Sequence, residues 1–365
     1  MTMIAVRDAL LARPPVLDDR LGHGPDNSLL LRHLAALLVI YGHAYALVNP
    51  ANFARGDLFA RLIPQFYSGS IGVCVFFALS GCLITRSWLR NPRIFRFIRA
   101  RILRIYPAYL VCLLLTVGLI GPLFNELAPI NYFEHAQTGK YFARNVDLVG
   151  LTYMLPGLFA SNPFPYVANG SLWSLALEVR MYLAIAILGV LRVLTWPRVF
   201  VVIVLFFTIY SLSGWIETAP QHQDKAALAM LFMMASLAAL FASRIPLSTR
   251  FLLVLVLLAV ASGESFLFVP MTMLALGYFS LWFSWRLPAW KLPWRGDYSY
   301  GLFLYGFPVQ QMIVATFPSI SPLALFAHAV PSSLILAIAS WHWVEQPSLR
   351  LKQLRSLDPA RTPGS

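Results

Sequence analysis

Long apolar runs separated by short polar segments dominate this sequence. An α-helix needs about 20 apolar residues to cross the hydrocarbon core of a bilayer, and ten segments approach or reach that length. We therefore predict an all-α protein, a polytopic integral membrane bundle of about ten transmembrane helices. The predicted spans are 28–48, 68–88, 102–123, 171–191, 198–214, 226–243, 250–262, 266–285, 300–317 and 323–344.

The segments between and around these spans are also informative. An apolar stretch, 146–160, runs into the Pro- and Asn-rich sequence "LPGLFASNPFPYVANG". Pro and Asn interrupt regular helices, so we predict a re-entrant or interfacial piece here. Residues 1–27 mix acids, bases and prolines without a sustained apolar run, unlike a cleavable signal peptide. We expect a cytoplasmic tail at 1–27, a transmembrane domain at 28–348 and a second cytoplasmic tail at 349–365.

The composition agrees with a membrane protein. Hydrophobic residues make up 59% of the chain and charged residues 12%, whereas a soluble domain is about half apolar and a quarter charged. Taken alone, the net charge of +13 suggests a nucleic-acid binder. The positions of the lysines and arginines relative to the membrane indicate otherwise. With a cytoplasmic N-terminus, the inner segments hold 22 of the 28 lysines and arginines, and the outer segments hold 5. This asymmetry predicts both termini in the cytoplasm and accounts for the charge without nucleic acid.

The three cysteines, Cys74, Cys82 and Cys112, all fall in apolar segments. Cys74 and Cys82 are about two helical turns apart, which is too far for a disulfide. We expect buried, inert thiols and no metal site.

The first predicted span contains ionisable residues in "RHLAALLVIYGH". Arg32 and His43 are 11 residues apart, which is about 16 Å along an α-helix and only about 20° around it. They therefore share one face, whereas His33 lies about 80° from His43 and is expected to face elsewhere. Two interpretations remain open. Either Arg32 reaches lipid phosphates while His43 makes a structural hydrogen bond, or both residues line a functional site.

A second cluster of charge follows the second span. Seven arginines and no acid lie between Arg86 and Arg104, in "TRSWLRNPRIFRFIRARILR". The positive-inside bias accounts for only some of them. The remainder predict an anion-binding surface, either for anionic lipid headgroups or for a polyphosphorylated ligand.

Glu178, in "SLWSLALEVRMY", is a carboxylate inside a predicted span. Such a placement is costly and marks either function or an ion pair with an arginine of another span. Ser80, in "FFALSGCLI", suits helix packing or a hydrogen bond between helices. Tyr106, Trp173 and Tyr182 are candidates to line a cavity, although aromatic residues near membrane interfaces are expected in any case.

Six sequence blocks follow one another along the chain: "R-x10-H" in the first span, "GVCVFFALSGCLITRSW", "RFIRARILRIYPAYL", "NGSLWSLALEVRMYL", "YSYGLFLYGFPV" and "WHWVEQPSLR". In this order they resemble the membrane acyltransferase-3 family. Members are integral membrane enzymes that transfer acyl groups, commonly acetyl from acetyl-CoA, onto cell-surface glycans and some small molecules. The resemblance implies an acyl-CoA-dependent O-acetyltransferase of a bacterial inner membrane, with no bound cofactor, that acts on a surface polysaccharide or a lipid-linked sugar.

The resemblance also implies roles for individual residues. His43 matches the family's essential histidine, as general base or as acyl acceptor. Glu178 matches its acidic position and is expected to orient or charge-stabilise a histidine. Acyl-CoA enters from the cytosol in this scheme, and its phosphates meet basic residues. The residues expected to bind the donor are Arg32, Arg96, Arg99, Arg101 and Arg104.

Departures from the family pattern keep other interpretations open. Cys74 stands where the family often has an acid, and Phe303–Gly306 replace a pattern that contains a second histidine. One alternative is a proton-coupled exporter of glycan or lipid, which would also carry intramembrane Arg, His and Glu, although the two halves show no repeat. Another is a lipid-binding scaffold, which leaves Glu178 unexplained. The expected partners are acyl-CoA, the sugar acceptor, membrane lipids, and glycan-assembly proteins or a second copy of the chain.

Overall fold

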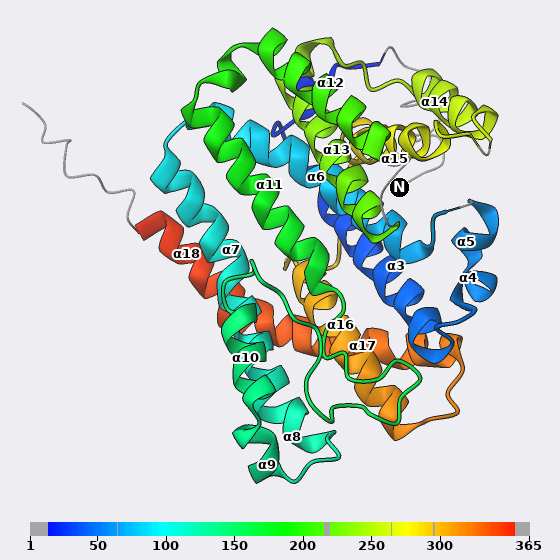
Figure 1. The fold of residues 1–365 in the computed structure, drawn as a ribbon. Coiled ribbons are helices and arrows are strands. Elements are labelled where there is room, and N and C mark those ends of the chain that lie inside the picture. Colours follow the sequence, from blue (N-terminus) through cyan, green and yellow to red (C-terminus); the bar gives the residue numbers. More distant parts are fainter. Residues whose placement is uncertain (1–13, 64, 215–219, 264, 295, 355–365) are drawn as a thin grey trace, which may run out of the picture. The chain divides into compact units, whose positions relative to one another are not determined.

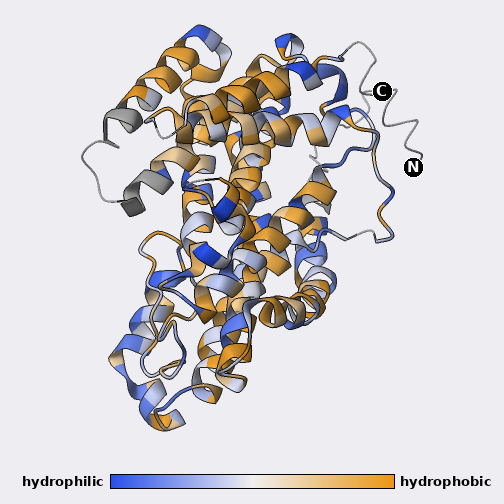
Figure 2. Cartoon of the chain, turned by 90° about the vertical axis from the view of Figure 1, so that its right-hand side faces the viewer, coloured by the Kyte–Doolittle hydropathy of each residue, from blue (hydrophilic) through white to orange (hydrophobic). Residues whose placement is uncertain are grey.

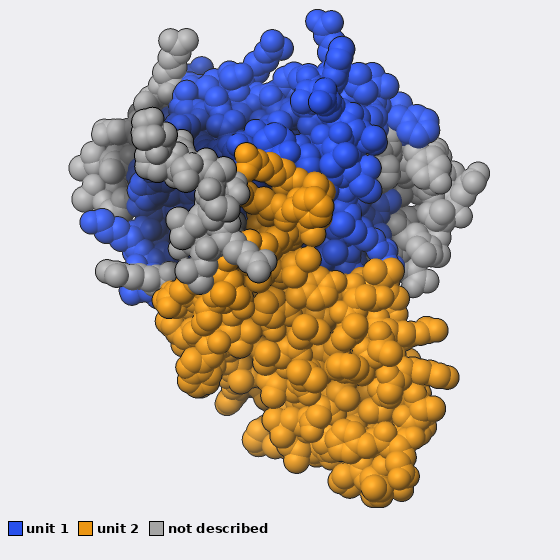
Figure 3. Space-filling model, turned by 90° about the vertical axis from the view of Figure 1, so that its left-hand side faces the viewer, with its two compact units in different colours: residues 1–92, 173–295 blue, residues 93–172, 296–365 orange. Residues whose placement is uncertain are grey.

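The structure is a computed structural model that describes residues 14–63, 65–214, 220–263, 265–294 and 296–354. Helices account for the regular structure of these residues (Figure 1), and three isolated β-bridges are the β-type pairings among them. The chain divides into two compact units, which are described separately (Figure 3). Unit 1 comprises Met1–Pro92 and Trp173–Arg295, and unit 2 comprises Arg93–Leu172 and Gly296–Ser365.

The helices of unit 1 are α2 Leu17–Arg20, α3 Ser28–Val48, α4 Phe53–Gly56, α5 Leu58–Leu62, α6 Ser68–Arg90, α11 Leu172–Val190, α12 Pro197–Gly214, α13 Pro220–Leu240, α14 Thr249–Ala261 and α15 Phe268–Arg286, with 3-10 turns η2 Val193–Thr195 and η3 Ala242–Arg244. Those of unit 2 are α7 Ile94–Leu115, α8 Gly121–Leu123, α9 Pro129–Glu134, α10 Ala136–Asn145, α16 Ser299–Thr316, α17 Pro322–Ser340 and α18 Gln346–Leu354, with π-helical turns η1 Thr116–Ile120 and η4 Trp341–Glu345.

The prediction of an all-helical fold is confirmed for the described residues. Each of the ten predicted spans falls on helical structure, and apolar residues occupy most of these helices (Figure 2). Among the described residues, six helices are long and apolar enough to cross a membrane: Ser28–Val48, Ser68–Arg90, Ile94–Leu123, Leu172–Val190, Phe268–Arg286 and Pro322–Leu351. Shorter apolar helices occur at Pro197–Phe206, Lys225–Leu240 and Thr249–Ala261. Ten crossings therefore remain a prediction.

Two regions differ from a simple alternation of spans and loops. α7 begins at Ile94, ahead of the predicted start at 102, so much of the arginine-rich segment is itself helical. The stretch 146–160 contains no regular helix. Its backbone is held by a hydrogen bond from the Leu155 N–H to the Tyr166 carbonyl, 3.0 Å long, and by a bridge between Asn125 and Leu158.

The described part of the N-terminal segment is docked onto unit 1. Leu17 and Leu21 are buried in a core cluster together with residues of α3, α6, α13 and α15. The Leu17 N–H donates to the carbonyl of Ile245 at 2.8 Å. The side chain of Asn27 donates to the carbonyls of Phe283, Leu287 and Pro288. These contacts fix the start of α3 against the end of α15.

Glycines set the close packing of α3 against α6. A Cβ atom on Gly42 would lie 2.5 Å from the backbone nitrogen of Gly69, and one on Gly72 would lie 2.5 Å from the carbonyl oxygen of Ala35. Small residues allow helix backbones to approach this closely in a membrane. Because Gly69 meets the later residue of α3 and Gly72 the earlier one, the two helices run antiparallel. All three cysteines are buried free thiols, as expected.

In unit 2 a buried amide pair fixes the irregular stretch to α16. Asn162 donates to the carbonyl oxygen and to the side-chain oxygen of Gln311, at 3.0 and 2.8 Å. Gln311 in turn donates to the carbonyls of Phe164 and Val167. Asn162 is 6% exposed and Gln311 is fully buried, so these bonds satisfy amide groups that would otherwise be costly to bury.

Candidate active site

Arg32 and His43 lie on one unbroken helix, α3. Both side chains are half-buried. Between them on the same face lie Ala36 and Val39, which are 0% and 2% exposed. Because the residues between them are buried, this face of α3 points into the protein, whereas an arginine that reaches lipid would lie on an exposed face.

His33 is separate from this face, as expected. It is 6% exposed, its Nδ1 lies 2.8 Å from the carbonyl oxygen of Leu29, and its ring centroid lies 5.6 Å from that of Trp294. These contacts are those of a packed structural histidine.

The antiparallel contact of α3 and α6 defines two ends of unit 1. We call the end where α3 finishes and α6 starts the His43 end; it contains Gly42, Gly69 and the α4–α5 segment. The opposite end, where α3 starts, is the Arg32 end. Leu31 belongs to the same buried cluster as Val75 and Leu79, so α6 reaches the level of Arg32 near residue 79.

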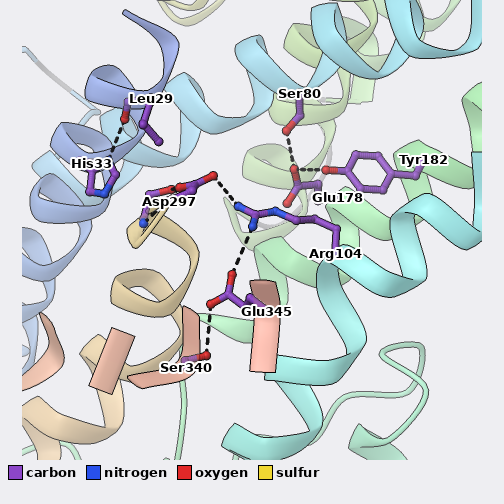
Figure 4. Close-up of polar contacts among 10 residues, drawn as sticks. Leu29, His33, Ser80, Arg104, Glu178, Tyr182, Asp297, Ser340 and Glu345 are labelled. Carbon is purple, nitrogen blue, oxygen red and sulfur yellow. Dashed lines mark hydrogen bonds and ion pairs between the residues drawn. The ribbon is translucent and has the colours of Figure 1, made fainter. Parts of the chain in front are cut away.

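Glu178 is held by two hydroxyl groups. The Ser80 Oγ and the Tyr182 hydroxyl each donate to its Oε1 at 2.5 Å (Figure 4). No described residue donates to the other oxygen, Oε2, which is not a fully buried atom. The two hydroxyl groups therefore fix the position of the carboxylate.

The register of α6 separates Glu178 from His43. Ser80 is 11 residues after Gly69, which is about 16 Å along α6 from the contact with Gly42. The carboxylate bonded to Ser80 therefore lies at the level of Arg32, too far from His43 for a hydrogen bond. The fold places Ser80 and Tyr182 in contact with Glu178, but it does not place Glu178 next to His43.

Most of the seven clustered arginines have partners within their own unit. In unit 1, Arg86 pairs with Asp18 at 2.7 Å and Arg90 donates to the Leu21 carbonyl. In unit 2, Arg99 donates to the Leu351 carbonyl at 2.5 Å, and the Arg101 guanidinium lies over the Phe97 ring. Arg93 and Arg96 are exposed. The run of positive charge is thus not one continuous anion-binding surface.

Arg104 is the most heavily bonded of the seven. Its Nη2 lies 2.6 Å from an oxygen of Asp297 and its Nη1 lies 3.2 Å from an oxygen of Glu345 (Figure 4). The guanidinium also lies over the rings of Tyr300 and Trp341. Glu345 is 1% exposed, so its charge depends on this pairing. The phosphate contact predicted for Arg104 competes with two carboxylates.

The π-helical turn η4 builds this ion cluster. Ser340 donates to Glu345 at 3.1 Å although the two are five residues apart. Five residues leave side chains about 140° apart on an α-helix, whereas the i to i+5 register of a π-helix brings them together. Asp297 and Glu345 were not among the residues predicted for the site. The available signal was an acid at the end of a span, in "WVEQP".

The other candidate cavity residues occupy ordinary positions. The Tyr106 hydroxyl donates to the carbonyl of Asp147 at 2.9 Å in unit 2. Trp173 is half-buried at the start of α11. Among the described residues, no group of three or more His, Cys, Asp or Glu is placed to hold a metal ion.

Comparison with known proteins decides the family. The sequence profile of the acyltransferase-3 family, described as an acyltransferase domain, matches residues 28–342. This chain belongs to the acyltransferase-3 family. It is 30% identical to an O-acetyl transferase of Shigella phage Sf6 over 86% of this chain and 93% of that protein. It is 27% identical to nodulation protein 10 of Rhizobium leguminosarum bv. viciae, over 90% and 94%. No solved structure matches.

The family membership confirms the resemblance found in the sequence blocks. This acyltransferase is a multi-pass membrane enzyme. Neither the exporter nor the scaffold interpretation is supported by these matches. Its fixed carboxylate, Glu178, and the protein-facing Arg32 and His43 belong to unit 1.

Proposed function

We propose that this acyltransferase transfers an acetyl group from acetyl-CoA to a hydroxyl of a surface polysaccharide or a lipid-linked sugar. The Shigella phage Sf6 relative is an O-acetyl transferase by name, which favours acetyl as the group and a hydroxyl as the acceptor. The helices at all ten predicted spans and the bias of lysine and arginine support ten crossings with both termini in the cytoplasm. The membrane we propose is the bacterial inner membrane.

His43 is the proposed catalytic residue. In direct transfer its imidazole takes the proton of the acceptor hydroxyl while the oxygen attacks the thioester carbonyl. The carbon–sulfur bond then breaks, and the leaving thiolate takes the proton, which gives the ester and coenzyme A. In the alternative, the imidazole attacks the thioester first, the carbon–sulfur bond breaks and coenzyme A leaves as the thiolate. The acceptor hydroxyl then takes the acetyl group from the imidazole, and its proton passes to the released imidazole. The observation that carries most weight is that Arg32 and His43 share a protein-facing side of α3.

Arg32, Arg96 and Arg101 are the proposed contacts for the donor phosphates. Arg32 lies on the inward face of α3, and Arg96 is exposed near the start of α7. A guanidinium binds phosphate through two parallel hydrogen bonds. Arg99 and Arg104, also predicted to bind the donor, are here proposed to anchor unit 2, because their guanidinium groups bond to its own backbone and carboxylates.

Glu178 is proposed to bind the donor through Oε2. It lies at the level of Arg32, where the neutral hydroxyl and amide groups next to the donor diphosphate would pass.

Glu178→Gln keeps an oxygen for Ser80 and Tyr182 but replaces the Oε2 acceptor with an NH2 donor. We expect KM for acetyl-CoA to rise about 10-fold or more, with kcat unchanged. Ser80→Ala, which leaves Oε2 intact, is expected to have a smaller effect. A fall in kcat at constant KM would contradict this role.

The proposed function is tested with the full chain purified into lipid nanodiscs. We expect it to bind coenzyme A and to transfer label from acetyl-CoA to a sugar acceptor as a base-labile ester. In cells, the deletion strain is expected to lose an acetyl ester of its surface glycan, and the intact gene to restore it. Loss of a transported solute with no change in any ester would contradict the proposal and favour the exporter.

A further inference from the structure

Asp57 is a fully buried carboxylate between the first two spans. Its side chain is 0% exposed. Oδ1 accepts hydrogen bonds from the N–H groups of Phe59 and Ala60, at 2.9 and 3.0 Å, and so caps α5. Oδ1 also accepts from the Ser68 hydroxyl at 2.9 Å, and both oxygens lie 3.2 Å from the Ser68 N–H. One carboxylate thus joins the starts of α5 and α6.

These bonds place Asp57 at the His43 end of unit 1. Ser68 precedes Gly69, whose backbone nitrogen meets Gly42, the residue before His43. On the other side, a Cβ atom on Gly56 would lie 2.5 Å from the ring of Tyr45 on α3. Two contacts with α3 therefore flank Asp57: its neighbour Gly56 packs on Tyr45, after His43, and the start of α6, bonded to Asp57, packs on Gly42, before His43.

The other acids with described side chains in unit 1 lie elsewhere. Asp18, Asp19 and Asp26 precede α3 at the Arg32 end. Glu178 is bonded to Ser80, at the level of Arg32. Cys74 occupies the position where the sequence blocks of the family often place an acid, and a buried thiol there supplies no charge. Asp57 is thus the described carboxylate of unit 1 at the His43 end.

We propose that Asp57 is the positioning residue for His43. The carboxylate fixes the start of α6 against α3 at the Gly42–Gly69 contact, and its negative charge favours the imidazolium that forms when His43 takes a proton. A buried charge acts over several ångströms because the surroundings screen it less than water does. The inference rests on the proposed function, since it requires His43 to act as a base.

The ionisable groups around this end of α3 are few. The first half of α15, Phe268–Leu276, carries no ionisable side chain. The groups on the remaining elements are Tyr41 and Tyr45 on α3, Tyr67 before α6, Cys74 on α6, and Arg55, Asp57 and Arg61 in the α4–α5 segment.

The test compares two matched variants, Asp57→Asn and Asp26→Asn. Asp26 makes the same kind of contacts as Asp57, accepting from the N–H and the hydroxyl of Ser28, but at the Arg32 end. Asn retains an oxygen that caps a helix and removes the charge. For Asp57→Asn we expect a several-fold fall in kcat, with KM for acetyl-CoA unchanged. We also expect the acid limb of the pH–kcat profile to move to lower pH by about half a unit or more.

Asp26→Asn is expected to leave kcat and the acid limb unchanged. An unshifted acid limb in Asp57→Asn, or an equal shift in Asp26→Asn, would overturn the proposal. Ser68→Ala is the second variant, because it keeps the charge while breaking the hydroxyl bond. It is expected to lower kcat without moving the acid limb to lower pH. Wild-type kcat in Ser68→Ala would also overturn the proposal, even if Asp57→Asn fails to fold.

Different outcomes would contradict the proposed function and the role of Asp57. If the wild-type protein forms no ester from acetyl-CoA, the proposed function is wrong. If the wild-type protein is active and the Asp57→Asn and Ser68→Ala variants behave like it, the proposed function stands and the role of Asp57 is wrong.

Discussion

Replacing His43 with alanine is expected to lower the rate of acetyl transfer by about 100- to 10,000-fold, the range that a positioned general acid–base supplies. The same loss or a larger one is expected if the imidazole carries the acetyl group itself. KM for acetyl-CoA should change little, because Arg32 lies 11 residues away at the other end of the shared face. The measurement is the initial rate of ester formation from labelled acetyl-CoA in nanodiscs.

His33→Ala is the matched control for this substitution. It removes the same side chain from the same helix, but His33 packs against Trp294 and bonds to the Leu29 carbonyl. We expect a lower melting temperature with most of the transfer rate retained. Wild-type activity in His43→Ala would show that the proposed mechanism is wrong. A burst of coenzyme A release without acceptor, absent from His43→Ala, would favour the acyl-histidine route over direct attack.

The helices and the shared face of α3 could be predicted because they depend on local sequence. Apolar runs place every predicted span on a helix, and the first, 28–48, coincides with α3. The helical period alone aligns Arg32 with His43 and turns His33 away. What the period does not supply is the direction of that face. The burial of Ala36 and Val39 between the two residues shows that it faces the protein.

The partners of the arginines between Arg86 and Arg104 could not be predicted from the sequence. Arg96 and Arg104 are the same residue type in the same helix, and both were expected to meet phosphates. The partners of Arg104 lie 193 and 241 residues further along the chain, and no local pattern identifies contacts at such separations. The partners of Glu178 illustrate the same limit, because Ser80 is 98 residues away. Asp57 carried only a weak signal, an acid before a short apolar run that is typical of a helix N-cap.

Arg104→Ala is expected to destabilise unit 2 by about 3–5 kcal/mol, because it leaves buried carboxylates without their counter-charge. Glu345 is 1% exposed and Asp297 is largely buried. Arg104→Lys should recover only part of this loss, since an ammonium cannot bond to two separate carboxylates in a planar fork while it stacks on Tyr300 and Trp341. Thermal unfolding in detergent measures the change.

The matched control is Arg96→Ala, two helical turns earlier on the same helix at an exposed position. It should shift stability by no more than about 0.5 kcal/mol while KM for acetyl-CoA rises, because this guanidinium is available to donor phosphates. Adding Glu345→Gln to Arg104→Ala should restore part of the lost stability, since the two residues are coupled. If Arg104→Ala were instead as stable as Arg96→Ala and raised KM, Arg104 would be a phosphate ligand, and its carboxylate partners would be displaced when the donor binds.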